Sequence, residues 1–502
     1  MKKINVLEVN NVDLPGRDFN GYDFISLLDK NKFSIKQAVI EKQSNNENVI
    51  EILPTDRLKL MYNKYVKYEK EKSIHNIVSI TSPTSMAMKE YQEADIIHLH
   101  MFHNTKLSIP SIIDMSTEKK VIITLHDPWL LTGRCVHFFE CDKWKTGCKK
   151  CPNINTMFPL KEDNCAALWN IKKETFAKAN VDIVVSSKWM YDCVKESPIF
   201  HTNKNVHLIP FGITSNKESI SKDEAKKHFN IPQEEKVLFF RAQKEFKGTE
   251  YIVEALKKLD FKGHITLIAC DKTGLLNELK DKYNILDLGY ISEDEVLKAM
   301  TACDMFLMPS KAESFGMMAI KAMSVARPVI IFDNSALPSV TFAPECGYSV
   351  KDKDAVALRK AIKKLLEDEA ECHKRGEYGK KLVEKYYSSE SYIANIEKLY
   401  EEVYNRKQKK SPKQLNKNSE KFTEISNELE MLLQENKIES GINNNYNSEN
   451  IVEINSINQH FYDKYHLDSV KMDRTFIRKL KDYLKKNKLL YKIYKKIYEM
   501  KK

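Results

Sequence analysis

Short β-rich hydrophobic runs alternate with amphipathic helical stretches along the first 400 residues of the chain. The runs expected to form strands are 4–9, 96–99, 121–125 and 183–185 in the first half, and 237–240, 265–268, 305–308 and 329–332 in the second. Strands that alternate with helices predict parallel sheets with crossover connections. Because the pattern occurs twice, we expect an α/β protein with two doubly wound domains and a hinge at 210–212.

The predicted domains are 1–205 and 206–388, and helices at about 355–368 and 372–386 close the second one. Apolar residues at helical spacing predict a further helix at 389–406. The composition then changes to Lys, Asn, Ser and Gln, which favours a polar linker over 407–470. Within the linker, one helix is expected from Phe422, Ile425, Leu429, Leu432 and Leu433.

Charge is concentrated at the end of the chain. The protein has 502 residues and a net charge of +11, and residues 471–502 alone carry thirteen Lys or Arg against three acidic residues. The body is therefore nearly neutral, which argues against a nucleic-acid-binding surface. The 471–502 segment predicts a basic amphipathic helix suited to an anionic membrane surface. A partner-binding helix and a solvated tail are the alternatives.

Two further features bear on location. No uncharged apolar run approaches the ~18 residues that span a bilayer, so an integral membrane protein is not expected. Glu8 interrupts the first apolar run within a few residues of the start, which argues against a secretory signal. We therefore expect a cytoplasmic protein, peripheral to the inner face of the membrane.

The segment 309–330, PSKAESFGMMAIKAMSVARPVI, predicts a phosphate site. A buried strand runs into a turn with a glycine and then into a helix, whose first amides have no partner within the helix. Arg241 at a strand end and Lys247 near a helix start would add two cations suited to a diphosphate. The alternative is that these two are ordinary solvated residues.

Together these motifs resemble the donor site of retaining glycosyltransferases of family 4, which have the GT-B fold: two Rossmann-like domains facing a central cleft. The resemblance implies that Glu313 contacts donor-sugar hydroxyls and that the helix 389–406 crosses back to brace the first domain. The donor-binding residues that it implies are Arg241, Lys247, Ser310, Phe315, Gly316, Met317 and Lys321.

Lys321 departs from the family pattern, which has a second Glu at this position. That Glu accepts hydrogen bonds from ribose hydroxyls, whereas an ammonium group can only donate. Ribose recognition is therefore expected to be altered. The departure also supports an alternative function, a non-catalytic GT-B subunit that binds or stabilises a partner glycosyltransferase.

The first domain is expected to carry the acceptor side. His126 ends a strand in TLHDPWLLTGRC, and the resemblance implies that it approaches the transferred sugar. Asp127 either orients the acceptor or caps a turn. The loop with Gly16, Asn20 and Gly21 is expected to face the cleft. His98, His100 and His103 are interpreted as cleft lining, with a metal site as the lesser alternative.

Cys135, Cys141, Cys148 and Cys151 fall within 17 residues, and Cys148-x2-Cys151 is a spacing that tetrahedral zinc favours. A structural Zn site is the favoured interpretation, with His137 as a substitute ligand, and packed reduced thiols are the alternative. No cofactor is expected for the chemistry itself. The resemblance implies transfer of a hexose from a UDP- or GDP-sugar to a growing glycan, with a lipid-linked cell-surface polysaccharide as the expected acceptor.

Overall fold

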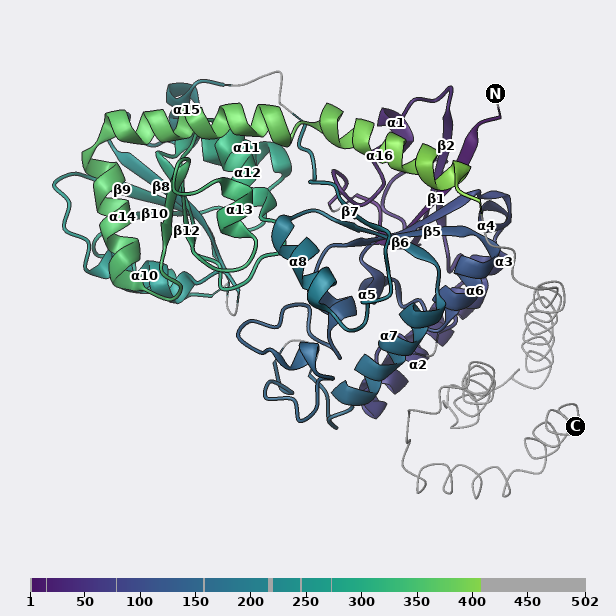
Figure 1. The fold of residues 1–502 in the computed structure, drawn as a ribbon. Helices are drawn as coiled ribbons and strands as arrows, with labels where there is room; N and C mark the ends of the chain where they lie inside the picture. Colours follow the sequence, from purple (N-terminus) through teal and green to yellow (C-terminus); the bar gives the residue numbers. More distant parts are fainter. Residues whose placement is uncertain are drawn as a thin grey trace, which may run out of the picture.

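Two parallel β-sheets, one in each half of the chain, organise the computed structural model of the protein (Figure 1). The structure describes residues 2–407 except 15, 78, 157–158, 215–219, 244–245 and 272. The predicted helix at 422–433, the basic segment 471–502 and all of the predicted linker except residue 407 lie outside the described residues.

The first sheet has seven strands in the order β3-β2-β1-β4-β5-β6-β7, and every neighbouring pair is parallel. Its strands are β1 (Ile4–Val12), β2 (Phe33–Glu41), β3 (Val49–Glu51), β4 (Ile96–Leu99), β5 (Lys120–Leu125), β6 (Val181–Val185) and β7 (Val206–Leu208). The α-helices of this half are α1 (Phe24–Leu27), α2 (Asp56–Lys72), α3 (Thr81–Ala87), α4 (Lys89–Glu93), α5 (Phe102–Thr105), α6 (Ser111–Glu118), α7 (Cys165–Lys178) and α8 (Lys188–Glu196). Two short 3₁₀ helices, η1 (Pro128–Leu131) and η2 (Lys143–Lys145), follow β5.

The second sheet has six parallel strands in the order β10-β9-β8-β11-β12-β13. They are β8 (Lys236–Ala242), β9 (Ile265–Asp271), β10 (Asn284–Asp287), β11 (Met305–Met308), β12 (Val329–Phe332) and β13 (Gly347–Val350). The helices of this half are α9 (Lys222–His228), α10 (Thr249–Lys257), η3 (Leu275–Leu279), α11 (Glu293–Ala302), α12 (Met317–Ser324), α13 (Leu337–Thr341), α14 (Ala355–Glu367), α15 (Glu369–Tyr386) and α16 (Ser389–Asn405). The predicted α/β class with two doubly wound domains is confirmed.

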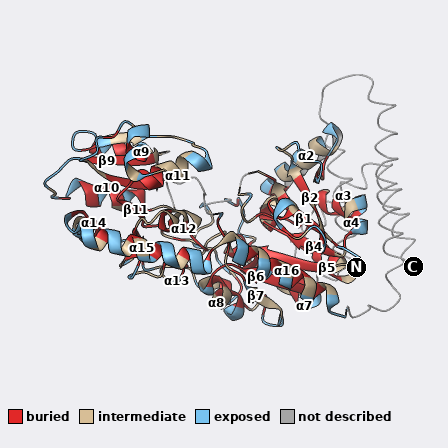
Figure 2. Ribbon diagram, turned by 90° about the horizontal axis from the view of Figure 1, so that it is seen from above, coloured by how far each residue is buried: buried red, intermediate tan, exposed pale blue. Residues whose placement is uncertain are grey.

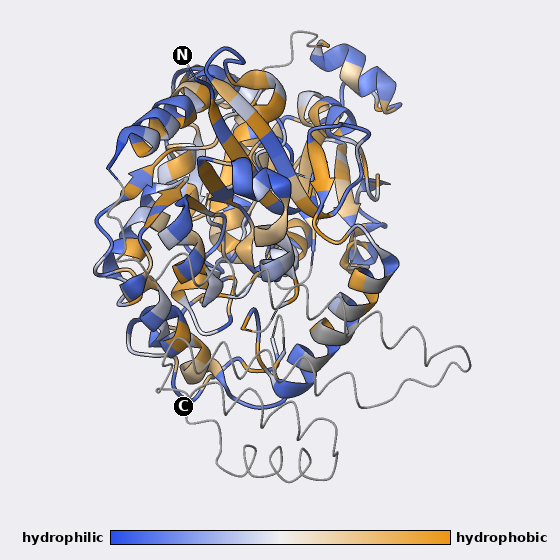
Figure 3. Ribbon diagram, turned by 90° about the vertical axis from the view of Figure 1, so that its right-hand side faces the viewer, coloured by the Kyte–Doolittle hydropathy of each residue, from blue (hydrophilic) through white to orange (hydrophobic). Residues whose placement is uncertain are grey.

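Each sheet is covered by helices on both faces, as parallel sheets require. Figure 2 shows the strands buried and the outer helix faces exposed, and Figure 3 shows hydrophobic segments gathered in the interior. Every residue of β4, β6, β11 and β12 is buried, and β11 and β12 are continuous apolar runs in the sequence. In the described part of the chain, none of the helices is both long enough and apolar enough to cross a bilayer.

Helix α16 follows the second domain but lies over the first, beside α1 and β1 (Figure 1). Its Glu397 carboxylate accepts a 2.7 Å hydrogen bond from the amide of Asp29. Just beyond the helix, Arg406 makes two hydrogen bonds of 2.7 and 2.9 Å to the carboxylate of Asp182. The apolar stripe of α16, which includes Ile396, is buried. These contacts join the end of the second domain to the first.

Candidate active site

The two sheets meet through segments that follow the carboxyl ends of their strands. In the first sheet, Asp18 lies in the segment after β1, Phe139 in the segment after β5, and Ser187 in the segment after β6. The Ser187 hydroxyl donates a 2.7 Å hydrogen bond to the carbonyl of Ser314, which follows β11 of the second sheet. Parallel sheets build their ligand sites at this edge, so the interface between the domains is the place where a site is expected.

On the second-domain side, Gly316 forms the elbow between β11 and α12. Its φ is +104°, and a Cβ atom added here would lie 2.6 Å from Cδ2 of Leu337, so this elbow requires glycine. No side chain caps α12 at Gly316. The amides that begin at Met317 are therefore left for water or for a ligand.

Lys247 and Glu313 form an ion pair at this elbow. The loops that carry them are joined by a 2.7 Å hydrogen bond from the amide of Lys311 to the carbonyl of Phe246. A Cβ atom added to Gly248 would lie 2.0 Å from the carbonyl oxygen of Pro309, so glycine permits this close contact. The structure thus brings two predicted donor residues together.

The other predicted donor residues differ in their exposure. Arg241 is exposed on β8 and is not part of the Lys247–Glu313 pair. The hydroxyls of Ser310 and of its neighbour Ser314 are buried and have no hydrogen-bond partner among the described residues. A buried polar atom without a partner costs about 1–3 kcal/mol. Two such hydroxyls beside the elbow are consistent with a polar ligand at this place.

Lys321 joins the two domains. Its ammonium lies 3.2 Å from the Asp18 carboxylate of the first domain and 3.0 Å from the Glu293 carboxylate at the start of α11. Burial alone would lower the pKa of Lys321, but the two carboxylates outweigh it and raise the pKa above its usual value. The sequence did not indicate Asp18 as the partner, because 303 positions separate the two residues.

On the first-domain side, His126 lies at the end of β5. Its ring stacks on Phe211 of the predicted hinge, with centroids 5.3 Å apart. A hydrogen bond of 3.1 Å joins its Nε2 to Nδ1 of His100. Its Nδ1 is buried and has no partner among the described residues. Burial lowers the pKa of His126 well below its usual value, so the ring is neutral at pH 7.

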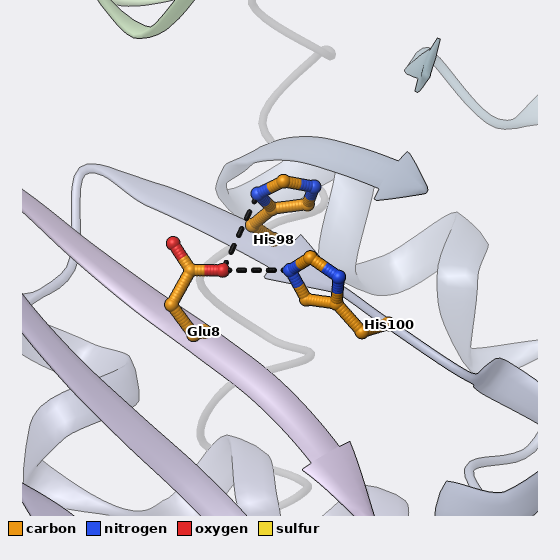
Figure 4. A group of neighbouring side chains, drawn as sticks. All are labelled: Glu8, His98 and His100. Carbon is orange, nitrogen blue, oxygen red and sulfur yellow. Dashed lines mark hydrogen bonds and ion pairs between the residues drawn. The ribbon is translucent and has the colours of Figure 1, made fainter. Parts of the chain in front are cut away.

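His100 belongs to a fully buried polar network that begins at Glu8 on β1 (Figure 4). The Glu8 carboxylate lies 2.8 Å from Nε2 of His100 and 3.3 Å from Nδ1 of His98. The hydroxyl of Tyr400, from α16, donates to Glu8 at 2.5 Å and lies 2.7 Å from Nδ1 of His98. Nε2 of His98 in turn bonds Thr124 at 2.7 Å.

This network bears on the metal alternative for the histidines. Within the described ranges, only Glu8, His98 and His100 bring three potential metal-ligand atoms within 4.8 Å of one another. Protein groups already bond these atoms, so the network is satisfied without an ion. His103 lies apart from it, 3.5 Å from the carboxylate of Asp127. The sequence signal for Glu8 as a site residue is a lone carboxylate inside an apolar strand, which above argues only against a secretory signal.

The other predicted acceptor-side residues have structural contacts. Asp127 accepts a 2.8 Å hydrogen bond from the amide of Trp129 and so caps η1. The amide group of Asn20 donates 2.7 Å to the carbonyl of Asp13 and holds the loop after β1. Gly21, at φ +90°, packs so tightly that an added Cβ would lie 2.7 Å from the Glu8 carboxylate. Gly16 also takes a positive φ, +73°, at a turn of the same loop.

His137 lies near the donor-side loop. Its ring centroid is 5.6 Å from that of Phe246, and its Nδ1 is buried without a partner among the described residues. Burial lowers the pKa of His137, and the charges of Glu313 and Lys247 also act on it. It does not line the small cavity that is surrounded by Cys135, Cys141, Cys148, Cys151 and Cys165.

Residues 221–382 match the family described as glycosyl transferases group 1. This group 1 region holds the Lys247–Glu313 pair, the Gly316 elbow and Lys321. Fold comparison agrees: a structure of HepE from Anabaena in complex with UDP and glucose superimposes with a TM-score of 0.56 at 13% identity, covering 80% of this chain and 100% of that one. The described part of the chain therefore has the GT-B fold.

Two curated relatives match parts of the chain. The chain is 35% identical over 88 residues to WcaC of Escherichia coli K12, named as a colanic acid biosynthesis glycosyl transferase; the match covers 16% of this chain and 22% of WcaC. It is 27% identical over 287 residues to an uncharacterised 41.2 kDa protein in the cps region of Klebsiella pneumoniae, covering 56% of this chain and 72% of that protein. The match thus spans less than a quarter of the length of WcaC.

Proposed function

We propose that the chain is a retaining glycosyltransferase that transfers a hexose from a UDP- or GDP-sugar to a growing glycan. The observation that carries the proposal is that His126 and His137 lie close to the Lys247–Glu313 pair and the Gly316 elbow. His126 stacks on Phe211, which packs against Phe315 next to the elbow, and His137 packs against Phe246 next to Lys247. The group 1 match supports it, as do WcaC, named for colanic acid biosynthesis, and the HepE complex with UDP and glucose.

In this proposal the donor separates the Lys247–Glu313 pair. The ammonium of Lys247 and the first amides of α12 hold the diphosphate, because cations and helix N-termini both stabilise phosphate charge. Arg241, exposed on β8, supplies a second cation. The Glu313 carboxylate then accepts hydrogen bonds from sugar hydroxyls. The ion pair keeps both side chains in place until the donor arrives.

The transfer needs no protein nucleophile. The bond between the sugar C1 and the phosphate oxygen breaks, a bond from C1 to the acceptor oxygen forms on the same face, and the acceptor proton passes to the leaving phosphate. Stabilising the charge of the diphosphate as it leaves is then the main contribution of the protein. Neutral His126, held by His100 and Phe211, contacts the sugar without adding charge.

For the acceptor we propose a lipid-linked glycan at the inner face of the membrane. The basic composition of 471–502 supports this, because such a segment is attracted to anionic lipid. Flotation of the full chain and of a chain without 471–502 on vesicles with anionic lipid tests it. We expect only the full chain to float, and equal flotation of both would contradict the assignment.

Donor binding tests the enzyme proposal. Titration calorimetry with a panel of UDP- and GDP-sugars should find one that binds, and K247A should weaken its binding by about tenfold or more, as loss of a charge-assisted contact to phosphate predicts. K257A is the matched control, because Lys257 forms an exposed ion pair with Glu278 on the same domain. If none of the nucleotide sugars binds, the chain is not a transferase, and the non-catalytic subunit becomes the favoured function.

A further inference from the structure

Five cysteines surround one small cavity in the loop between β5 and α7. The thiols that line it are Cys135, Cys141, Cys148, Cys151 and Cys165. The cavity has a volume of about 20 Å³, which is room for one water-sized occupant. Cys165, the first residue of α7, joins the four cysteines that the sequence pattern had grouped. All five are free thiols in the structure.

The backbone around the cavity is held by hydrogen bonds that also orient the sulfur atoms. The amide of Gly133 donates a 3.2 Å hydrogen bond to Sγ of Cys148. Asp163 accepts from the amides of Cys151 at 2.7 Å and Cys165 at 3.2 Å, so one carboxylate ties both ends of the loop. Hydrogen bonds to ligand atoms and to their backbone are the outer contacts that position metal ligands.

The cavity lies beside a buried lysine. Lys172 on α7 is completely buried, and its ammonium donates to the carbonyls of Trp129 and Thr132 at 2.6 and 2.8 Å. It is close enough to Cys148 and Cys135 to interact with their charges. The two carbonyl acceptors are neutral, and a buried ammonium is costly unless an anion lies nearby. Asp127 supplies one negative charge near Lys172, and thiolates around the cavity would add to it.

We propose that the cavity is a structural site for one Zn²⁺ ion, bound by the thiolates of Cys135, Cys141, Cys148 and Cys151. Four S–H bonds break, four Zn–S bonds form and four protons leave to solvent, without oxidation or reduction. The complex carries a net charge of about −2, which the Lys172 ammonium partly offsets. Cys165 lies next to Cys151 and serves as a packing neighbour rather than a ligand.

Binding requires the thiols to turn toward the centre of the cavity. Among the residues that the structure describes, the cysteines do not form a group with three ligand atoms within 4.8 Å of one another. Rotation about the Cα–Cβ bonds moves each sulfur atom by a few ångströms without changing the backbone. The hydrogen-bonded loop can therefore remain as it is while the metal draws the sulfurs together.

The site would fix a loop that reaches the donor domain. Phe139 stacks on Phe246 with centroids 5.6 Å apart, and Glu140 forms an ion pair with Lys353. Phe246 directly precedes Lys247 of the proposed donor site. A metal at the base of the loop thus holds the segment that contacts the donor-binding loop, although the metal site itself rests on the cysteines alone.

Metal analysis of the full chain, purified under reducing conditions without added zinc, tests the proposal. We expect about one Zn²⁺ per chain, released when a mercurial blocks the thiols and detected by a chromophoric chelator. C148S and C151S should lose most of the metal. C165S and C193S should retain it, because Cys165 is assigned to packing and Cys193 lies on α8 away from the cavity lining.

Reconstitution keeps the test independent of how the variants fold. Unfolded and refolded full-length chain mixed with Co²⁺ should show thiolate-to-metal charge-transfer absorption that saturates at one equivalent. Absence of bound zinc in the purified protein, together with failure to take up one equivalent of Zn²⁺ or Co²⁺, would overturn the site. Retention of zinc in a folded C148S protein, with loss in C165S, would overturn the ligand assignment.

Discussion

Replacing Lys321 by glutamate should weaken the contact between the two domains rather than restore a nucleotide pocket. The ammonium lies 3.2 Å from Asp18 and 3.0 Å from Glu293, so K321E brings three carboxylates together. At an effective dielectric constant of about 20, each unit-charge pair at this distance interacts with about 5 kcal/mol before desolvation is counted. The sign of both interactions reverses in the variant.

The net effect is smaller and comes mainly from Asp18. The side chains of Lys321 and Asp18 are 13% and 15% exposed, whereas that of Glu293 is 59% exposed. Solvent therefore screens the Glu293 contact to at most about 1 kcal/mol. Breaking a largely buried pair costs about 3–5 kcal/mol, because the remaining charge stays buried without its partner. We expect K321E to lower the free energy of unfolding by about this amount.

Denaturant titration followed by circular dichroism measures the change, and calorimetry with the bound nucleotide sugar measures donor affinity separately. K298E is the matched control, because Lys298 pairs with Asp294 and Glu295 inside one domain, and a much smaller shift than that of K321E is expected. D18K combined with K321E should recover part of the loss. An unchanged midpoint in K321E together with tighter donor binding would refute the reasoning and place residue 321 in the ribose pocket.

Three further outcomes are expected from single substitutions. Y400F removes the hydroxyl that donates to buried Glu8 and should cost about 1–3 kcal/mol of unfolding free energy. Y386F, at an exposed tyrosine, should cost much less, and equal denaturation midpoints for the two variants would contradict this. Burial holds the pKa of His100 at about 3, below its usual 6.5, so the unfolded chain binds more protons at acidic pH. The stability that neutral His100 contributes is present above pH 6.5 and falls as the pH drops toward 3, by about 1.4 kcal/mol at pH 5.5. In urea titrations, H100Q should therefore lose less unfolding free energy than the unchanged protein between pH 7.5 and 5.5. An identical loss in both proteins would contradict this. G316A forces a side chain into the positive-φ elbow at a cost of about 1–3 kcal/mol of unfolding free energy. Calorimetry should show donor binding weakened by about tenfold or more, with an unchanged circular dichroism spectrum. Unchanged donor binding would contradict the role of the elbow.

The architecture could be predicted because buried strands are continuous apolar runs, as in β11, MFLM. The missed strands are those where burial is partial. In β2 the run FSIKQAVIE mixes polar and apolar residues, and β10, NILD, and β13, GYSV, are short edge strands that do not have an interior pattern. Local sequence therefore indicates the centre of each sheet better than its edges.

For the site residues too, the sequence predicts what depends on neighbouring positions and does not predict what depends on distant ones. Gly316 and Lys247 could be named because a strand, a turn and a helix start are consecutive in the sequence. Contacts between residues that lie hundreds of positions apart could not be predicted. Tyr400 meets Glu8 across 392 positions, and Lys321 meets Asp18 across 303. These pairings depend on how the two domains are placed, which residue spacing does not encode.

The position of Lys321 also explains its departure from the donor pattern in physical terms. The loop after β1 brings the Asp18 carboxylate to α12, and the start of α11 brings Glu293, so the surroundings of residue 321 are already acidic. A glutamate here would be repelled by both carboxylates, whereas a lysine attracts both and holds the first domain against the second. Residues 18 and 321 should therefore tolerate exchange of charge only as a pair. A variant that reverses both charges should keep the domain contact, and either reversal alone should weaken it.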